Sequence, residues 1–484
     1  MTKSNFINGE WMAGSGPDFV SRDPATNDLL WEGASASDAD VDQAFESARR
    51  AFASWSMTSL EDRLEYVNRF QSLALEAKPD MGLLIAKETG KLLWDALGEG
   101  GALSAKAAIS VESFKDRTGD LTRETAFGRA ALTHRPHGVL AVLGPYNFPA
   151  HLPNGQILPA LIAGNTVVFK PSEQCPAVGE ALTRLFEAAG FPPGVVNMVQ
   201  GARDTGAAVL SHPELDGVLF TGSAKTGAYI HKMFGGRPEI ILALEMGGNN
   251  PLIVWDVADL EATASIIVQS AFMSSGQRCT CARRLIIPDD DRGDQILEKL
   301  LTLTDRLTLG SWQDGDQATL GPVISAEIAN HVIQSAAELK SLGAKVLREA
   351  RSSEKGAAFV MPGIYDVTNI DVPDEEIFGP VLQIQRASDW SSAIEAANNT
   401  RFGLAAGLIS DQADLWTDFR NRIRAGVVNF NRPTTGAASF LPFGGPGASG
   451  NHNPGAYYAA DFCAWPMASQ IAEEVEYMPL KGLS

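Results

Sequence analysis

The stretch GVLAVLGPYNFPAHLPNGQILPALIAGNTVVFKPSE, residues 138–173, decides the fold. It contains two apolar runs, Val139–Leu143 and Thr166–Lys170, that have the length of buried strands. Helix-compatible sequence that begins near Phe148 separates them. A strand, a helix and a second strand in this order predict a βαβ unit with parallel strands.

The same alternation continues downstream, so this unit is one of a series. Further strand-like runs are Val195–Val199, Val218–Thr221, Ile240–Leu244 and Leu252–Val254, with helix-compatible stretches at Ala177–Ala189 and Thr226–Phe234. A second series has a helix near Leu260–Ser274, a strand at Arg284–Ile287 and further elements to Phe430. The pattern predicts an α/β protein with two Rossmann-like parallel-sheet domains.

We expect two domains and a small β arm. The 484 residues exceed the roughly 250–300 at which one hydrophobic core stops growing. EMGGNN at 245–250 interrupts the alternation, and the polar stretch Leu121–Arg135 has the pattern of an edge hairpin. The predicted division assigns 1–120 and 137–247 to the first domain, 248–446 to the second, and 121–136 with 447–484 to an arm and a tail.

The composition is that of a globular protein from a reducing compartment. A formal net charge of -19 disfavours contact with nucleic-acid phosphates and with anionic membranes. Four cysteines in this length form no disulfide framework, and the N-terminal MTKSNFINGEW has no apolar core for a signal peptide. We therefore expect a cytoplasmic protein without a nucleic-acid or membrane partner, whose anionic ligands would need local basic groups.

Cys279 in SSGQRCTCARR, directly after a predicted helix, is the first candidate for chemistry. A thiolate is the strongest ordinary side-chain nucleophile near neutral pH, and Arg278 favours that form if the two side chains meet. Two other interpretations stay open: Cys279 is a small buried residue, or it shares a metal with Cys281. No further Cys or His stands at ligand spacing, so we expect no metal site.

Glu245 and Asn147 are candidates for proton transfer and charge stabilisation. Glu245 ends the apolar run EIILALE before two glycines, at the strand end where parallel-sheet enzymes place reacting groups. Burial there would raise its pKa toward that of a general base. Asn147, between a strand and a helix, has an amide that can donate to a developing oxyanion. The alternatives are a salt-bridged strand end and a plain turn residue.

Three loops have features of nucleotide contacts. FTGSAKTG at 220–227 follows a strand and opens a helix, so its backbone N–H groups can hold a pyrophosphate. It is neither the Gly-x-Gly-x-x-Gly fingerprint nor a P-loop. Lys170 and Glu173 follow another strand, and Glu376 with Phe378 lies in EEIFGP. Each loop taken alone is more often solvated surface than a binding site.

Together these motifs resemble the aldehyde dehydrogenase superfamily. The shared motifs, in order, are Asn147, KPSE, FTGSAKTG, EMGG, GQRC, EIFGP and PFGG (Pro442–Gly445). The resemblance extends from FINGEW to LPFGGPGASG and covers essentially the whole chain. It implies the aldehyde dehydrogenase fold, NAD as cofactor, and a homodimer or dimer of dimers bridged by the predicted hairpin and tail.

The resemblance also implies a role for each candidate residue. Cys279 corresponds to the nucleophile, Glu245 to the base that hydrolyses the thioester, and Asn147 to the oxyanion donor. The implied cofactor contacts are Lys170 and Glu173 at the adenosine ribose, Gly222, Ser223, Ala224, Lys225, Thr226 and Gly227 at the pyrophosphate, and Glu376 with Phe378 at the nicotinamide end. The first domain would bind NAD and the second would be catalytic.

Two stretches depart from the commonest superfamily pattern. PGASGNHNPGAYYAADFCAWP replaces a basic, glycine-rich continuation after PFGG, and FPAHLPNGQILPAL carries a polar insertion in the helix after Asn147. Both resemble one subfamily, the N-succinylglutamate 5-semialdehyde dehydrogenases of the arginine succinyltransferase pathway. The resemblance implies an anionic aldehyde substrate.

The residues expected to contact this substrate are His151, Arg278, Thr280 and Arg432. Positions three, four and seven after Phe148 share its helix face, so His151, Leu152 and Gly155 should line one tunnel wall with it. Arg278 and Thr280 flank Cys279, and Arg432 lies in a loop that closes the tunnel mouth in the family. The alternative is that both arginines pair with acidic neighbours.

Three other functions share much of this pattern. A coenzyme A-acylating aldehyde dehydrogenase needs no water-activating carboxylate, so Glu245 argues against it. A non-catalytic nucleotide-binding protein on the same fold does not need Cys279, Glu245 and Asn147 together. A broad-specificity aldehyde dehydrogenase would differ only in its substrate preference.

Overall fold

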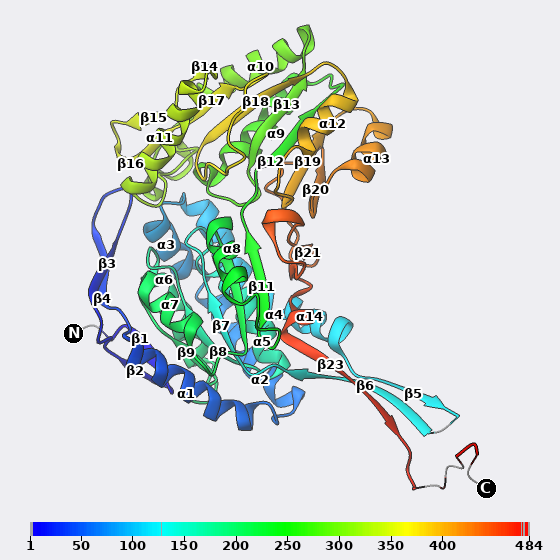
Figure 1. Cartoon of the computed structure of the whole chain (residues 1–484). Helices are drawn as coiled ribbons and strands as arrows, with labels where there is room; N and C mark the ends of the chain where they lie inside the picture. The colour runs from blue at the N-terminus through cyan, green and yellow to red at the C-terminus, as the bar shows by residue number, and fades with distance from the viewer. Residues whose placement is uncertain (1–2, 127, 476, 478–479, 483–484) are drawn as a thin grey trace.

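The computed structural model describes residues 3–126, 128–475, 477 and 480–482. It contains two seven-stranded sheets with helices packed around them, and a three-stranded arm that extends away from both (Figure 1). The predicted α/β fold with two parallel-sheet bodies and a β arm is therefore confirmed. Within the described residues, no helix combines the length and apolar character needed to cross a membrane.

The first sheet has the strand order β11-β10-β7-β8-β9-β1-β2. Its parallel strands are β7 (Val139–Leu143), β8 (Thr166–Lys170), β9 (Val196–Met198), β10 (Gly217–Gly222) and β11 (Ile241–Met246), and the hairpin β1 (Asn5–Ile7) and β2 (Glu10–Met12) extends it. Both β7 and β8 have the predicted bounds, because each is an apolar run buried along its whole length.

The helices described between residues 38 and 233 belong to this first body. They are α1 (Asp38–Trp55), α2 (Leu60–Glu76), α3 (Lys78–Thr89), α4 (Leu93–Thr118), α5 (His151–Ala163), α6 (Pro176–Ala188), α7 (Arg203–Ser211) and α8 (Ala224–Met233). A separate hairpin, β3 (Asp18–Arg22) and β4 (Leu29–Ala34), lies on one side. The largest cluster of buried apolar side chains joins α2, α4, α5 and α6 to the sheet.

The helix after Asn147 begins later than predicted. We expected it near Phe148, but α5 begins at His151. Pro149 explains the delay, because a proline disfavours helical backbone at the residue before it. The N–H of Leu152 still donates to the carbonyl of Phe148 at 3.3 Å, so these two residues keep the predicted spacing along one face.

The second sheet has the strand order β14-β17-β18-β13-β12-β19-β20, and only β14 is antiparallel to its neighbour among the described strands. Its strands are β12 (Asn250–Val254), β13 (Ala282–Pro288), β14 (Lys345–Arg348), β17 (Gly363–Asp366), β18 (Val381–Ala387), β19 (Ala405–Ile409) and β20 (Val427–Phe430). The helices are α9 (Leu260–Phe272), α10 (Asp291–Thr304), α11 (Ala326–Ser341), α12 (Trp390–Asn398) and α13 (Ala413–Arg422), with a small hairpin β15 (Arg351–Ser353) and β16 (Gly356–Met361).

The arm consists of β5 (Leu121–Thr125), β6 (Gly128–Pro136) and β23 (Ala464–Ile471). The hairpin predicted at Leu121–Arg135 is thus present, and β23 pairs with residues 129–136 of β6. Of the tail predicted after residue 446, only β23 joins the arm. The preceding elements, β21 (Pro442–Phe443), β22 (Gly455–Ala456) and α14 (Ala459–Cys463), return to the two bodies (Figure 1).

Candidate active site

A cavity of about 360 Å³ lies where elements of both bodies meet. Its described lining residues are Asp95, Gly98, Glu99, Ala102 and Lys106 of α4; Phe148, His151, Leu152, Gly155 and Gln156; Thr221 and Glu245; Arg278, Cys279 and Thr280; and Thr435, Ala437, Ala438, Ser439, Phe443, Gly455 and Ala456. The cavity therefore contains the predicted nucleophile and the predicted base.

Glu245 is buried near the carboxyl end of β11, with one oxygen left free. Its Oε1 accepts a hydrogen bond from the N–H of Gly455 at 2.8 Å, while Oε2 is buried without a hydrogen-bond partner among the described residues. Burial raises the pKa of Glu245 to about 8, and the Gly455 hydrogen bond opposes this only in part. The side chain is therefore a proton-exchanging group close to neutral pH, and its partner is a backbone N–H rather than a basic residue.

The loop that departs from the commonest superfamily pattern holds β11 in place. Asn451 accepts from the N–H of Leu244 at 2.9 Å and donates to the carbonyl of Leu242 at 2.8 Å. Asn453 donates to the same carbonyl at 2.6 Å. These side chains satisfy backbone groups at the open edge of the strand, and they fix the segment that carries Glu245.

Cys279 follows a turn of left-handed backbone. Ser274, Ser275 and Gly276 have φ values of 52°, 53° and 73°, which are unfavourable for the two serines. A Cβ at Gly276 would lie 2.1 Å from the carbonyl oxygen of Gly379, so only glycine fits there. This turn ends the helical path of α9 at Phe272, two residues earlier than predicted.

Asn250 fixes the backbone around Cys279. Its amide donates to the carbonyl of Cys279 at 2.7 Å and to that of Cys281 at 2.8 Å. Its side-chain oxygen accepts from the N–H of Ala405 at 2.9 Å. Both N–H groups and the oxygen of this buried amide are thus hydrogen-bonded, and these bonds hold the Cys279 segment against the second sheet.

The charge that favours a Cys279 thiolate comes from Arg283, and the expectation for Arg278 is wrong. Burial raises the pKa of Cys279 to about 12, with Glu376 and Glu245 acting in the same direction and Arg283 against it. Arg283 is fully buried and pairs with Glu376 at 2.9 Å. Arg278 instead turns toward α4, where it pairs with Asp95 at 2.6 Å.

Asn147 lies beside the GQRC loop. The side chain is buried, and its amide donates to the carbonyl of Gln277 at 3.0 Å. Gln277 in turn accepts from the N–H of Ile324 at 3.0 Å through its side chain. The structure therefore brings Asn147 next to the segment that carries Cys279, as the oxyanion hypothesis requires.

The predicted adenosine contacts emerge at one edge of the first sheet. Lys170 donates to the carbonyls of Pro171 and Gly201 at 2.9 and 2.6 Å, and lies 3.6 Å from Glu173. Burial lowers the pKa of Lys170, and the Glu173 carboxylate opposes that shift. The Glu173 side chain is about half exposed, at 48%.

The predicted pyrophosphate loop forms the start of α8. Ser223 is the N-cap and accepts from the N–H of Thr226 at 3.2 Å. Ser223, Lys225 and Thr226 are exposed, whereas Gly222 and Ala224 are partly buried. A Cβ at Gly227 would lie 2.2 Å from the sulfur of Met246, so this glycine lets α8 pack closely against β11.

Glu376 and Phe378 lie near the junction of the two bodies. A Cβ at Gly247 would lie 1.8 Å from Oε2 of Glu376, so the first glycine of EMGG makes room for this carboxylate. Phe378 contacts Tyr146 edge-on, with ring centroids 6.0 Å apart. Both residues thus lie close to the segments that carry Glu245 and Asn147.

Three of the four predicted substrate residues line the cavity. His151, Arg278 and Thr280 do so, together with Phe148, Leu152 and Gly155 as predicted. Arg432 is exposed and is not among the described lining residues, so the structure does not bring it to the site. Its loop continues from β20 for several residues before Thr435 reaches the cavity, which the sequence could not indicate.

Sequence analysis missed Asn250, Arg283 and Lys106. Asn250 and Arg283 stand inside quoted motifs, but nothing in their spacing shows that their side chains turn toward the Cys279 segment. For Lys106, the sequence does contain an indication of burial. It is a single lysine among small residues in GALSAKAAIS, three positions after the buried Leu103.

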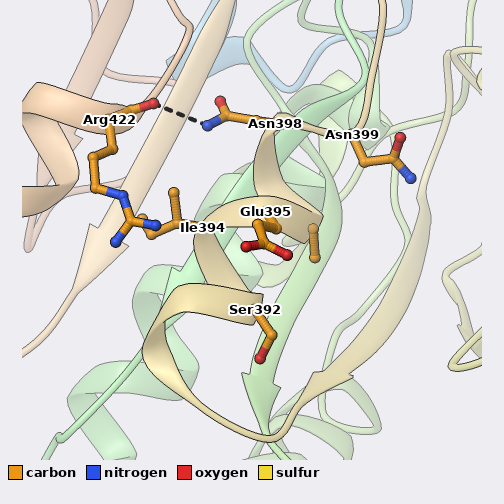
Figure 2. Close-up of a pocket in the computed structure, with 7 residues that line it drawn as sticks. Ser392, Ile394, Glu395, Asn398, Asn399 and Arg422 are labelled. Carbon is orange, nitrogen blue, oxygen red and sulfur yellow. Dashed lines mark hydrogen bonds between the residues drawn. The ribbon is translucent and has the colours of Figure 1, made fainter.

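A second hollow, of about 790 Å³, lies beside α12 and α13 (Figure 2). Asn398 there donates to the carbonyl of Arg422 at 2.9 Å. The residues described as lining it include neither cysteine nor histidine, and Ser392 is engaged by the Asp389 cap of its own helix. We therefore assign the chemistry to the cavity that contains Cys279.

Across the described residues, no group of three or more His, Cys, Asp or Glu side chains is arranged to hold a metal ion.

Replacing Asn250 by alanine should lower the rate of aldehyde oxidation roughly 10²-fold, the usual cost of displacing a reacting group by about 1 Å. The change removes both amide contacts to the Cys279 segment. Steady-state kinetics should show the effect mainly in kcat. Asn249→Ala is the matched control, because that buried amide bonds to Asp374 instead. Equal losses in the two variants would contradict a specific role for Asn250.

Comparison with known proteins identifies the family of this chain. The model of the aldehyde dehydrogenase family matches residues 11–465. A protein of Paraburkholderia xenovorans (strain LB400) named N-succinylglutamate 5-semialdehyde dehydrogenase is 53% identical over 472 residues, which cover 97% of each chain.

Two solved structures are similar over almost their whole length. A putative methylmalonate-semialdehyde dehydrogenase from Sinorhizobium meliloti 1021, complexed with NAD, has a TM-score of 0.90 at 26% identity, covering 97% of this chain and 98% of that one. An NADP-dependent glyceraldehyde-3-phosphate dehydrogenase from Bacillus halodurans C-125, complexed with NADP, has a TM-score of 0.87 at 29% identity, covering 97% and 99%. With a cysteine and a glutamate in one cavity and a match over residues 11–465, the chain belongs to the aldehyde dehydrogenase family.

Proposed function

We propose that this protein catalyses the NAD-dependent oxidation of N-succinyl-L-glutamate 5-semialdehyde to N-succinyl-L-glutamate in arginine catabolism. The observation that carries the proposal is that Cys279 and Glu245 line one cavity, in a chain 53% identical to a relative named for this substrate. The free Oε2 of Glu245 suits the activation of water, which an acyl transfer to coenzyme A does not need.

The chemistry uses four groups of the chain. Cys279 loses its thiol proton to solvent water as its sulfur attacks the aldehyde carbon, and the resulting oxyanion accepts hydrogen bonds from the Asn147 amide and the Cys279 backbone N–H. Losing one such donor typically costs about 10²–10³ in rate. Hydride then leaves the tetrahedral carbon, and a thioester on Cys279 results. Glu245 takes a proton from water, which attacks the thioester and releases the carboxylic acid and the thiol.

NAD supplies the hydride acceptor when it is bound. The first sheet fits it, because β8 and β10 flank β7 in parallel, so that their carboxyl-end loops emerge at one edge. Lys170 and Glu173 would hold the adenosine ribose, and the exposed residues at the start of α8 the pyrophosphate. Glu376 and Phe378 would contact the nicotinamide end.

Glu173→Gln should reduce the preference for NAD over NADP roughly tenfold, the worth of a hydrogen bond to a charged group. A carboxylate accepts hydrogen bonds from ribose hydroxyls and repels a 2′-phosphate. The measurement is the ratio of kcat/KM for the two cofactors. Glu46→Gln on the exposed face of α1 is the control, since Glu46 forms only an exposed contact with Arg50. An unchanged ratio would assign the preference to another residue.

We further propose a cytoplasmic homodimer or dimer of dimers in which the arm joins subunits. Exposed apolar side chains on the arm, Leu121, Trp465 and Ile471, support this assembly. The four cysteines are all free, as expected in a reducing compartment.

The decisive experiment compares kcat/KM for succinylglutamate semialdehyde with that for short neutral aldehydes, by following NADH formation. A strong preference for the anionic aldehyde is expected. Equal turnover of both classes would favour the broad-specificity alternative, and no NADH at all would favour a non-catalytic protein.

A further inference from the structure

The acidic residues of the α4 wall of the cavity already have cationic partners. Asp95 pairs with Arg278 at 2.6 Å, and Glu99 pairs with Lys91 at 2.7 Å. Glu99 is further saturated by the N–H groups of Ala150 and His151, at 3.0 and 3.1 Å. Neither carboxylate is free to neutralise another cation in the cavity.

Lys106 is a buried cation without a partner. Its residue exposure is only 3%, and it lines the same cavity from α4. No hydrogen bond or ion pair to its ammonium group occurs among the described residues. Burying a charge is costly unless an opposite charge compensates for it, and this burial lowers the pKa of Lys106 to about 8.

The facing helix leaves space for the end of this side chain. A Cβ at Gly155 of α5 would lie 2.8 Å from Cε of Lys106 and 3.5 Å from Nζ. Its neighbour His151 adds no second positive charge, because burial and the nearby Lys106 and Lys91 lower the pKa of its imidazole to about 3 and keep the ring neutral. The ammonium group therefore lies at the cavity, and no anionic side chain pairs with it among the described residues.

We propose that Lys106 determines specificity by binding a carboxylate of the aldehyde substrate. The inference rests on the proposed function, in that it requires an anionic aldehyde. It also replaces the expectation that Arg278 and Arg432 bind the substrate carboxylates. Arg278 is already paired with Asp95, and Arg432 is not among the described residues that line the cavity. A carboxylate bound there would remove the uncompensated charge and would meet local attraction despite a formal net charge of -19.

The test is Lys106→Met, which keeps the length of the side chain and removes its charge. We expect kcat/KM for succinylglutamate semialdehyde to fall about 10- to 100-fold, mainly through KM, the usual range for losing a hydrogen bond to a charged group. The loss on a neutral aldehyde of similar length should be much smaller. Lys115→Met is the matched control, because Lys115 is exposed on the same helix. Equal losses on both aldehydes, or no loss on the anionic one, would overturn the proposal.

A second measurement separates this inference from the proposed function. Glutarate, an unreactive dicarboxylate, should inhibit oxidation of a neutral aldehyde by the unmodified enzyme, and at least about tenfold more weakly in Lys106→Met. If the unmodified enzyme shows no preference for the anionic aldehyde, the proposed function fails, while glutarate inhibition still decides the role of Lys106. Should Lys106→Met not fold, Gly155→Ala displaces the ammonium without removing it, and it should weaken glutarate binding likewise. Undiminished inhibition in the folded variant would contradict the assignment.

Discussion

Cys279→Ala should abolish aldehyde oxidation, with kcat reduced by on the order of 10⁴–10⁶, as for other enzymes that lose their nucleophile. The side chain lines the cavity, and its backbone is held by Asn250, so the loss is one of chemistry rather than of fold. Binding of NAD, measured by calorimetry, should persist because its proposed contacts lie on the first sheet.

Cys281→Ser is the control for this prediction. Cys281 is fully buried, and its sulfur lies 3.7 Å from the carbonyl of Met273, where a hydroxyl can make a similar contact. Activity should therefore fall only modestly. A requirement for both cysteines would support a shared metal or redox role, and substantial oxidation by Cys279→Ala would exclude the proposed nucleophile.

Glu245→Gln should separate the two half-reactions. The amide keeps the contact to the Gly455 N–H but cannot accept a proton, so the thioester should form once and then persist. Rapid-mixing measurements should show one NADH per active site, followed by turnover slowed about 10²–10⁴-fold. Loss of the burst itself would mean that Glu245 also takes the thiol proton. That outcome has a physical reason, because burial keeps the Cys279 thiol protonated at rest, with a pKa of about 12.

The pH dependence of the same step follows from the carboxyl group. Only the ionised form of Glu245 is a base, and burial raises its pKa to about 8. Thioester hydrolysis in the unmodified enzyme should therefore accelerate as the pH rises through about 8 and become constant above it. Glu245→Gln should lack this inflection.

The sequence predicted the parts of the molecule whose structure is determined locally. The strands Val139–Leu143 and Thr166–Lys170 have the predicted bounds. Each is a short apolar run between turn residues, and such a run is typical of a buried strand. The ordered motifs also predicted Cys279, Glu245 and Asn147 as site residues. The fold brings Cys279 and Glu245 into one cavity and Asn147 beside Gln277, while their catalytic roles stay predictions.

Side-chain partners across the fold could not be predicted in the same way. Arg278 is adjacent to Cys279 in sequence yet pairs with Asp95, 183 residues away along the chain. Arg283 and Asn250 act through contacts to segments that are distant from them in sequence, such as Glu376 for Arg283 and Cys279 for Asn250. Such contacts depend on tertiary geometry, and neither spacing nor composition encodes it in a single sequence.

The asparagines along β11 have a consequence for how this protein behaves at high concentration. β11 ends its sheet, and a bare strand edge is a template on which a strand of another molecule can add, the first step of aggregation. The side-chain amides of Asn451 and Asn453 form hydrogen bonds with the backbone of β11 at that edge. A side chain, unlike a strand, has no further row of N–H and C=O groups with which another strand can pair. The contacts that hold the Glu245 segment thus also cover an edge on which a strand of another molecule can add.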